Sequence, residues 1–303
     1  MRIVIIGASG LIGRNLYAAA RSSGRKVVGT CHIRKNKELV SYDMRSQSLR
    51  SVLPDINSSD VVCLLSAYSN PSWIYNNQDE AFQLNLFATK RLINEVFEVG
   101  ARLIFMSSVE VFDGKEGNYN EKSSPGPINL YGKMKFEIEN YLLEKGGKSC
   151  IVRTGWNVGW DFNDRCVIRL TYNTLIHPEA KMAKDNIFSI IDVRDTVEGL
   201  LRLCDNPGIR VCHLASNPSI VRTELASLIM NFSKYKDLMA YEVVLFSDIP
   251  YSEPRGRCNH LDNSFAISSL GINFRPPKEI IRQKVELLDR HIADIKSAPN
   301  GFV

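Results

Sequence analysis

A glycine-rich turn between an apolar run and a helical pattern dominates the first twenty residues of this chain. Residues 3–6 are consecutive β-branched residues, which is typical of a buried central strand in a parallel sheet. Gly7, Gly10 and Gly13 follow at three-residue spacing, and leucine and alanine then recur at helical spacing. A strand, a tight turn and a helix in this order predict a dinucleotide-binding motif, in which the helix N-terminus faces a diphosphate.

Each glycine of this motif has its own expected role. Gly7 allows the turn, Gly10 lets the diphosphate approach the main chain without a Cβ in the way, and Gly13 lets the helix pack closely on the strand. Leu11 and Ile12 begin the helix and are expected to line the same site. The spacing is Gly-x-x-Gly-x-x-Gly and not the widely quoted Gly-x-Gly-x-x-Gly, and this difference bears on the family.

Further apolar runs alternate with helical patterns along the first half of the chain. Strands are expected over residues 26–30, 39–42, 60–65, 102–106 and 149–153, and a long helix over residues 78–99. This alternation predicts an α/β fold with a doubly wound parallel Rossmann sheet, which binds ligands at the carboxyl ends of its strands. The pattern is irregular between residues 160 and 186, where we expect a smaller C-terminal α/β lobe for the substrate.

The length of 303 residues is enough for about two domains. We expect an NADP-binding domain over residues 1–155 and a substrate-binding lobe over most of residues 156–303. A strand and a helix near residues 188–215 are expected to return to the first domain, with Asp192 as a helix N-cap and His213 in a structural role. The first expected strand begins at Arg2 and no apolar run reaches the ~18 residues of a membrane span, so we expect a cytoplasmic protein.

Charge and cysteine usage limit the classes of partner. The net charge of +5 is spread along the chain, which favours a small anionic ligand over nucleic acid. The seven cysteines are scattered without a Cys-x-x-Cys pair, so we expect reduced thiols and no metal site. The expected partner is therefore a small molecule, and neither a membrane nor a nucleic acid.

The end of the second expected strand bears on the choice of nicotinamide cofactor. An acidic residue there would bind the ribose 2′-hydroxyl of NAD, but this chain instead offers Arg34 and Lys35 to a 2′-phosphate. NADP is therefore favoured, with NAD as the alternative, and a solvated basic loop is the other interpretation of the two cations.

Residues after the third and fourth expected strands could contact the same cofactor. Asp43 and Met44 could reach the adenine, although a simple turn role for Asp43 stays open. Ser66 and Ala67 are small, so they leave room for the cofactor at the end of their strand.

Three side chains are candidates for proton transfer. Tyr131 and Lys135 are four residues apart, so they share one face of a helix. Ser108 comes two residues after the end of the strand expected over residues 102–106. A free tyrosine has a pKa of about 10, and a lysine ammonium nearby would lower it toward neutrality. Ser108 could hydrogen-bond the same substrate oxygen. A solvent-facing helix pair is the alternative interpretation of the tyrosine and lysine alone.

At these residues the sequence resembles the extended short-chain dehydrogenase/reductases, and within them the dTDP-4-dehydrorhamnose reductase group. Residues 107–114 are similar to the family's Ser-Thr-Asp-Tyr-Val-Phe-Asp-Gly segment, and residues 129–135 to its Asn-x-Tyr-Gly-x-x-Lys segment. The resemblance implies that Ser108 is the hydroxyl partner, that Tyr131 is the acid, and that Lys135 lowers its pKa and holds the ribose. Asn85 resembles an asparagine that the wider family places near the lysine and its water relay.

The resemblance also implies substrate contacts. Trp156 and Asn157 lie in a segment similar to the family's Arg-Thr-Ser-Trp at the entrance to the sugar site, although a core role for the tryptophan stays open. Arg255 lies in a segment similar to the region near the nucleotide diphosphate. Val109 and Glu110 replace the family's usual Asp-Tyr, and the carboxylate leaves open a substrate other than dTDP-4-dehydrorhamnose.

The activity implied by this resemblance is NADPH-dependent reduction of a nucleotide-linked 4-keto-6-deoxy sugar. A nucleotide-sugar 4-epimerase or dehydratase is the alternative among enzymes. The regulatory beta subunit of methionine adenosyltransferase also resembles the family, so an NADP-binding subunit without catalysis is the alternative outside enzymes. A homodimer through the helices that contain Gln78 and Tyr131 is common in the wider family and is a further expectation.

Overall fold

The computed structural model describes residues 1–33 and 36–297 of the chain, and its centre is one seven-stranded parallel sheet in the order β11-β6-β5-β4-β1-β2-β3. Every neighbouring pair in this sheet is parallel. Its strands are β1 (Arg2–Ile6), β2 (Lys26–Cys31), β3 (Val40–Ser41), β4 (Asp60–Leu64), β5 (Arg102–Met106), β6 (Ser149–Thr154) and β11 (Val211–Leu214). The predicted doubly wound parallel sheet is therefore confirmed.

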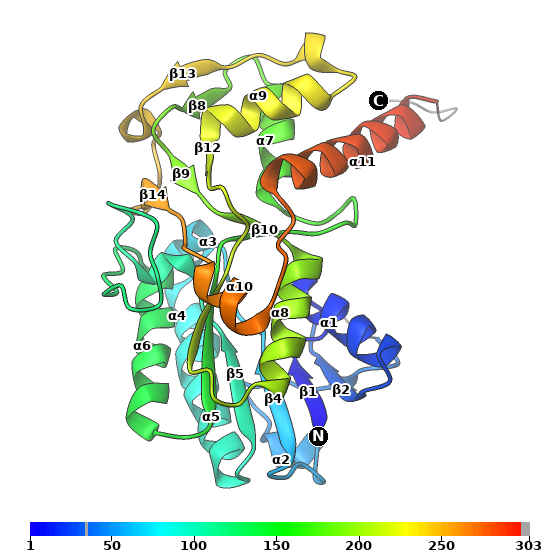
Figure 1. Ribbon diagram of the computed structural model, residues 1–303, viewed down its shortest axis with the longest axis vertical. Coiled ribbons are helices and arrows are strands. Elements are labelled where there is room, and N and C mark those ends of the chain that lie inside the picture. Colours follow the sequence, from blue (N-terminus) through cyan, green and yellow to red (C-terminus); the bar gives the residue numbers. More distant parts are fainter. Residues whose placement is uncertain (34–35, 298–303) are drawn as a thin grey trace.

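Helices cover both faces of this sheet (Figure 1). The helical segments on one side are α2 (Leu49–Val52), α4 (Gln78–Phe82), the π-helical segment η1 (Gln83–Ala88), α5 (Thr89–Glu98) and α6 (Leu130–Lys145). The helices on the other side are α1 (Leu11–Ser22), α8 (Val193–Asp205) and α10 (Ser264–Leu270). Each layer buries its own apolar cluster against the strands, so two separate cores sandwich the sheet.

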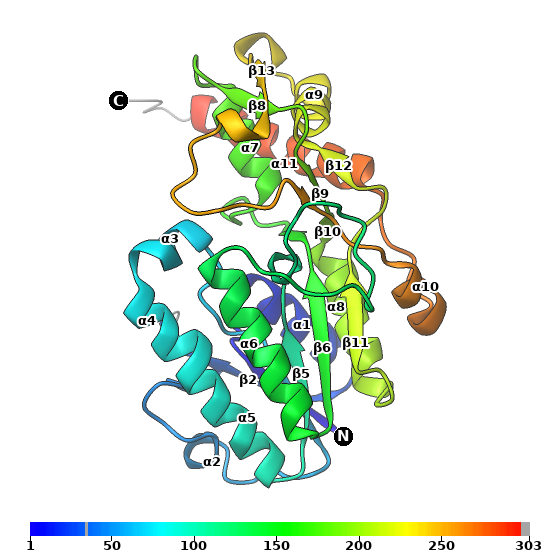
Figure 2. The same ribbon diagram turned by 90° about the vertical axis from the view of Figure 1, so that its left-hand side faces the viewer.

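A second lobe lies beyond the carboxyl ends of the strands (Figure 2). Its core is a third apolar cluster, to which α7, α9 and α11 contribute. Its strands are β7 (Trp156–Val158), β8 (Lys181–Ala183), β9 (Ile187–Phe188), β10 (Ile190–Asp192), β12 (Ile220–Val221), β13 (Glu242–Val244) and β14 (Cys258–Asn259). Its helices are α7 (Val167–Leu175), α9 (Arg222–Phe232) and α11 (Pro277–Ser297).

The chain enters this lobe after β6 and comes back to the sheet through α8 and β11. Strand β11 pairs in parallel with β6, as expected for residues 211–214. Asp192 accepts a hydrogen bond from the main-chain N–H of Arg194 and caps α8, also as expected. The boundary between the two expected domains near residue 155 stays a prediction.

The structure adds two details that the sequence pattern did not predict. The segment of irregular pattern between residues 160 and 186 contains α7 and β8, whose buried positions include the polar residues Thr171 and Tyr172 and so hide the periodicity. The expected helix over residues 78–99 is continuous but contains the π-helical segment η1. Within the described residues, every helix is too short or too polar to cross a lipid bilayer.

Candidate active site

The glycine turn after β1 has the geometry that its sequence predicts. Gly7 has a φ of +92°, and a Cβ there would lie 2.9 Å from the main-chain nitrogen of Ser66. A Cβ on Gly13 would overlap the main-chain oxygen of Gly7. Gly10 is the N-cap of α1, so the free N–H groups of this helix begin directly at the turn. Gly7 and Gly13 therefore let the turn, the chain after β4 and helix α1 pack closely together, and Gly10 leaves the helix N-terminus uncovered by a side chain.

A first cleft of about 480 Å³ opens beside this turn. It runs across the ends of β1, β2 and β4. The predicted residues that line it are Gly7, Gly10, Leu11, Asp43, Met44, Ser66 and Ala67. Arg34 and Lys35 lie outside the described residues, so their predicted contact with a 2′-phosphate stays a prediction.

Two basic side chains that the sequence did not point to, His32 and Arg45, line the first cleft. Arg45 donates from Nε to Asp43 Oδ1 at 3.1 Å, and its terminal nitrogen lies 3.1 Å from Nε2 of His32. Burial opposes the ionisation of Asp43, but the hydrogen bonds from Arg45 outweigh it and hold the pKa of Asp43 below its usual value. The signal for Arg45 was its position two residues after a strand-end aspartate.

A second cleft of about 360 Å³ adjoins the first along the glycine turn. It holds the candidate proton-transfer residues together with most of the predicted substrate contacts. The predicted residues that line it are Gly7, Gly10, Leu11, Ile12, Gly13, Ala67, Ser108, Val109, Glu110, Tyr131, Lys135, Trp156, Asn157 and Arg255. Residues more than a hundred positions apart therefore face one space.

The candidate catalytic side chains are held by β5 and α6. Tyr131 and Lys135 lie on the inner face of α6 and are only 8% and 7% exposed. The ammonium of Lys135 donates to the main-chain oxygen of Met106 at 2.8 Å and lies 5.8 Å from the centroid of the Tyr131 ring. Ser108 lies two residues after β5 and accepts a hydrogen bond from the N–H of Glu110 at 3.2 Å. The solvent-facing interpretation of the helix pair is therefore wrong.

The protonation of this pair differs from the expectation. Burial raises the pKa of Tyr131 well above its usual value, with Glu110 adding to the effect and Ser108 opposing it. Burial lowers the pKa of Lys135 to about 8, while Glu139 one turn later opposes the change. In the protein alone Tyr131 therefore keeps its proton at neutral pH, and its pKa is not lowered.

Asn85 lies in the π-helical segment and is buried. Its Oδ1 accepts from the N–H of Tyr68 at 3.0 Å, and its Nδ2 donates to the carbonyl of Tyr68 at 2.9 Å. These two bonds fix the chain that follows β4 along the wall of the first cleft. The asparagine thus shapes the cofactor side of the site, and the water relay implied by the family resemblance stays a prediction.

A third cleft of about 340 Å³ lies toward the lobe and carries three guanidinium groups, from Arg165, Arg222 and Arg255. Arg222 is the first residue of α9, and its guanidinium lies 4.4 Å from the centroid of the Phe188 ring. Its polar contacts are long ones to Asn186 and Thr171, both at 3.4 Å, and no ion pair of Arg222 occurs in the described part of the chain. Burial lowers its pKa to about 10.

Arg255 borders both the second and the third cleft. It pairs with Glu253 and donates to Ser72 Oγ at 3.1 Å. Its Nε is buried and, among the described residues, has no hydrogen-bond partner. Arg222 and Arg165 had no signal in the sequence, because only the folding of the lobe brings them beside Arg255.

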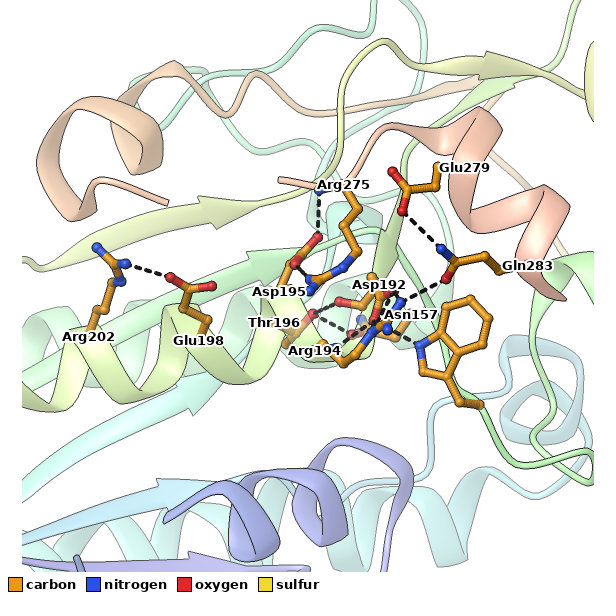
Figure 3. A network of polar contacts seen from close by, with 11 residues as sticks. Asn157, Asp192, Arg194, Asp195, Thr196, Glu198, Arg202, Arg275, Glu279 and Gln283 are labelled. Carbon is orange, nitrogen blue, oxygen red and sulfur yellow. Dashed lines mark hydrogen bonds and ion pairs between the residues drawn. The ribbon is translucent and has the colours of Figure 1, made fainter. Parts of the chain in front are cut away.

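Polar contacts at the start of α8 tie the lobe to the sheet (Figure 3). Arg194 donates to Asp192 at 3.0 Å and to Gln283 of α11 at 3.1 Å. The hydroxyl of Thr196 donates to Oδ1 of Asn157 at 2.6 Å, and the amide of Asn157 donates to Thr154 at 3.1 Å. The polar atoms of Asn157 are thus engaged inside the protein, although the residue lines the second cleft.

The parallel doubly wound sheet, its glycine turn and the adjoining clefts define a protein of the dinucleotide-binding Rossmann class. The family model for the RmlD substrate binding domain matches residues 1–289, so the chain belongs to this family. The family expected from the sequence is therefore confirmed.

Comparison with known proteins gives relatives of two kinds. The chain is 35% identical over 155 residues to methionine adenosyltransferase 2 subunit beta of Bos taurus, which covers 50% of this chain and 46% of that protein. The matched part is thus about half the length of that relative. The chain is also 28% identical over 232 residues to dTDP-4-dehydrorhamnose reductase of Mycobacterium tuberculosis, which covers 73% of this chain and 72% of that protein.

Solved structures share the fold over nearly the whole chain. A dTDP-4-dehydrorhamnose reductase from Clostridium acetobutylicum superposes with a TM-score of 0.81 at 22% identity and covers 95% of this chain and 99% of its own. The enzyme of the same name from Bacillus anthracis, solved in complex with NADP, has a TM-score of 0.76 at 22% identity and covers 97% and 99%.

Proposed function

We propose that the protein is an NADPH-dependent reductase of a nucleotide-linked 4-keto-6-deoxy sugar, with NADH as the alternative cofactor. The observation that carries the proposal is that Ser108, Tyr131 and Lys135 line the same cleft as the glycine turn. Gly10, which carries no side chain, is the N-cap of α1, and the free N–H groups of this helix end suit a dinucleotide diphosphate. The relative from Mycobacterium tuberculosis is named as such a reductase, and the structure from Bacillus anthracis holds NADP.

The residues of the second cleft would divide the chemistry among them. The cofactor supplies a hydride to the keto carbon. Tyr131 gives its proton to the keto oxygen, and because an alkoxide is a far stronger base than a phenolate, the raised pKa of Tyr131 keeps the proton available without blocking its transfer. Ser108 hydrogen-bonds the same oxygen, and Lys135, held at Met106, places its ammonium below the ring of Tyr131.

The third cleft would hold the nucleotide part of the substrate. Arg222 offers a partly buried cation that makes no ion pair in the described part of the chain. Arg255 offers a buried N–H that has no acceptor there. Diphosphate oxygens are strong acceptors for guanidinium groups. A nucleotide sugar that crosses from the third cleft into the second would then bring its keto group to Tyr131.

The test is NADPH oxidation, followed at the nicotinamide absorbance, with 4-keto-6-deoxy sugars linked to dTDP, UDP and GDP. Tyr131→Phe should lower turnover by about 10²- to 10⁴-fold and leave the Kd for NADPH unchanged. Tyr141→Phe is the matched control, because this tyrosine is on the same helix and its hydroxyl donates to Asn94. Turnover that survives in Tyr131→Phe would contradict the assignment.

A second candidate is an NADP-binding regulatory subunit without turnover, which the match to methionine adenosyltransferase 2 subunit beta favours. This candidate predicts tight NADPH binding and no oxidation with any keto sugar of the panel. An epimerase would instead convert the sugar without net consumption of NADPH. The same assay with product analysis therefore separates the three functions.

A further inference from the structure

Glu110 lies where the second and third clefts meet. It projects from the 3-10 turn Val109–Val111 that follows β5, and it lines both clefts. Tyr131 and Ser108 lie on the side of the second cleft, and Arg222 lies on the side of the third. A ligand that extends from Arg222 to Tyr131 would cross the border between the two clefts, and this carboxylate is part of that border.

The carboxylate is fixed from two directions. Asn129, which caps the N-terminus of α6, donates from Nδ2 to Glu110 Oε2 at 2.6 Å. Asn259 of β14 donates from Nδ2 to Glu110 Oε1 at 3.2 Å. The amides come from the catalytic helix and from the lobe, so the two oxygens of Glu110 cannot turn away from the cleft without breaking one of these bonds.

The two amide donors do not use all hydrogen-bond acceptor positions of the Glu110 carboxylate. An ionised carboxylate has about four acceptor positions, and the two asparagine amides occupy two of them. Burial raises the pKa of Glu110, while the two amides and the nearby Arg255 guanidinium oppose this change. The hydrogen bonds of Arg255 itself go to Glu253 and Ser72. Burial also makes each unused acceptor position costly. A ligand with a hydroxyl at this place would meet an acceptor, whereas a methyl or methylene group would cover it without a hydrogen bond.

We propose that Glu110 accepts a hydrogen bond from one hydroxyl of the substrate's sugar and so selects a sugar that bears this hydroxyl over the corresponding deoxy sugar. The inference rests on the proposed function, because it needs a nucleotide sugar that spans the two clefts. A site built to hydrogen-bond a substrate hydroxyl rejects an analogue that lacks it, since the buried acceptor is left unpaired. Glu110 is then a specificity residue and not an acid or base of the reaction.

The experiment is calorimetric titration of the full chain, saturated with NADP, with UDP, dTDP and a series of deoxy analogues. The analogues are 2-, 3-, 4- and 6-deoxyglucose, each linked to whichever nucleoside diphosphate binds more tightly, and the parent is the glucose compound. We expect one of the four analogues to bind about 10- to 100-fold more weakly than the parent. In Glu110→Gln that one difference should shrink to within about threefold, while the other three analogues should behave as in the wild type.

Glu116→Gln is the matched control, because it removes the same charge from an exposed position a few residues later. It should keep the full discrimination of the wild type. The wild-type series can overturn the inference by itself, whether or not Glu110→Gln folds. Equal binding of all four analogues by the wild type, or unchanged discrimination in a folded Glu110→Gln, would overturn it.

The same titrations separate this inference from the proposed function. Failure of both UDP and dTDP to bind would overturn both, whereas tight nucleotide binding with no preference among the analogues would overturn only the role of Glu110. If the sensitive analogue is the 6-deoxy one, Glu110 reads the C6 hydroxyl. The sugar of the proposed reaction would then carry a 6-hydroxyl in place of the 6-deoxy carbon.

Discussion

The guanidinium of Arg222 lies 4.4 Å from the centroid of the Phe188 ring, and it makes no ion pair within the described residues. Removing a cation from water without a counter-charge costs free energy, and stacking on an aromatic ring recovers only part of it. Arg222 lines the third cleft, so an anionic ligand bound there would supply the missing counter-charge and recover this free energy.

Arg222→Gln should weaken the binding of UDP or dTDP by about tenfold or more, since it removes a charge-assisted hydrogen bond to a phosphate. The free energy of unfolding should stay the same or rise, because no carboxylate loses its partner. Calorimetry and chemical denaturation measure the two quantities. Arg169→Gln is the control, because that guanidinium stacks on Phe162 in the same lobe and lines none of the three clefts. Equal loss of affinity in both variants would remove Arg222 from the site.

Arg45→Gln should lower the preference for NADPH over NADH. The guanidinium lines the first cleft between Asp43 and His32, where a 2′-phosphate could displace one of its present partners. The ratio of the two Kd values should fall by about tenfold. Arg50→Gln, which changes an exposed arginine outside the cleft, should leave the ratio unchanged. If Arg45→Gln leaves the ratio of the two Kd values unchanged, Arg45 does not bind the 2′-phosphate, and Arg34 and Lys35 are the remaining candidates.

Gly13→Ala should damage both the fold and cofactor binding. The added methyl would overlap the main-chain oxygen of Gly7, so helix α1 must move away from the turn. Overpacking of this kind costs about 1–3 kcal/mol in the free energy of unfolding. Gly208→Ala is a suitable comparison, because a Cβ there meets no atom within 4 Å. A Gly13→Ala protein with wild-type stability and NADPH affinity would contradict the described turn.

His213 should make the protein sensitive to acid. Burial, together with Arg153, lowers the pKa of His213 to about 3, and its two ring nitrogens face the carbonyl of Tyr119 at 3.0 Å and Arg153 at 3.4 Å. Because the unfolded chain takes up this proton near pH 6.5 and the folded protein does not, stability falls as the pH drops below 6.5. The slope from this one group is about 1.4 kcal/mol per pH unit.

Denaturation curves between pH 7 and pH 4 would measure this effect. His213→Gln should show a shallower fall in the free energy of unfolding than the wild type over this range. The exposed His177 serves as the comparison, and His177→Gln should follow the wild-type curve. Parallel curves for all three proteins would show that His213 titrates normally in the folded state.

The sequence allowed the sheet and the glycine turn to be predicted because both are local patterns. Residues 3–6 and 103–106 are uninterrupted apolar runs, and each of them is buried in a strand of the central sheet. The face shared by Tyr131 and Lys135 also followed from spacing alone. The role of Arg222 could not be predicted, because Arg222 reaches the cleft that also contains Glu110 and Arg255 only when the lobe folds.

The pKa shifts of Tyr131 and Lys135 could not be predicted from the sequence either. Spacing placed Lys135 near Tyr131, but the direction of the tyrosine pKa shift depends on burial, which a linear pattern does not measure. The hydrogen bond that Asn157 Oδ1 accepts from Thr196 was also not predictable from the sequence, and the contact of Asn157 with a substrate stays a prediction. This bond joins the start of α8 to β7 across 39 positions of the sequence, and no short motif encodes such a contact.

The π-helical segment Gln83–Ala88 sets the rotation between two faces of one continuous helix, the face that carries Asn85 and the face that carries Leu92 and Val96. An α-helix turns by about 100° per residue, and a π turn takes up one residue more than a normal turn. Deleting one residue here would rotate Asn85 away from Tyr68, or else rotate Leu92 and Val96 out of the sheet core. The extra residue of the π turn therefore lets one helix hold the wall of the first cleft through Asn85 and pack against the sheet through Leu92 and Val96.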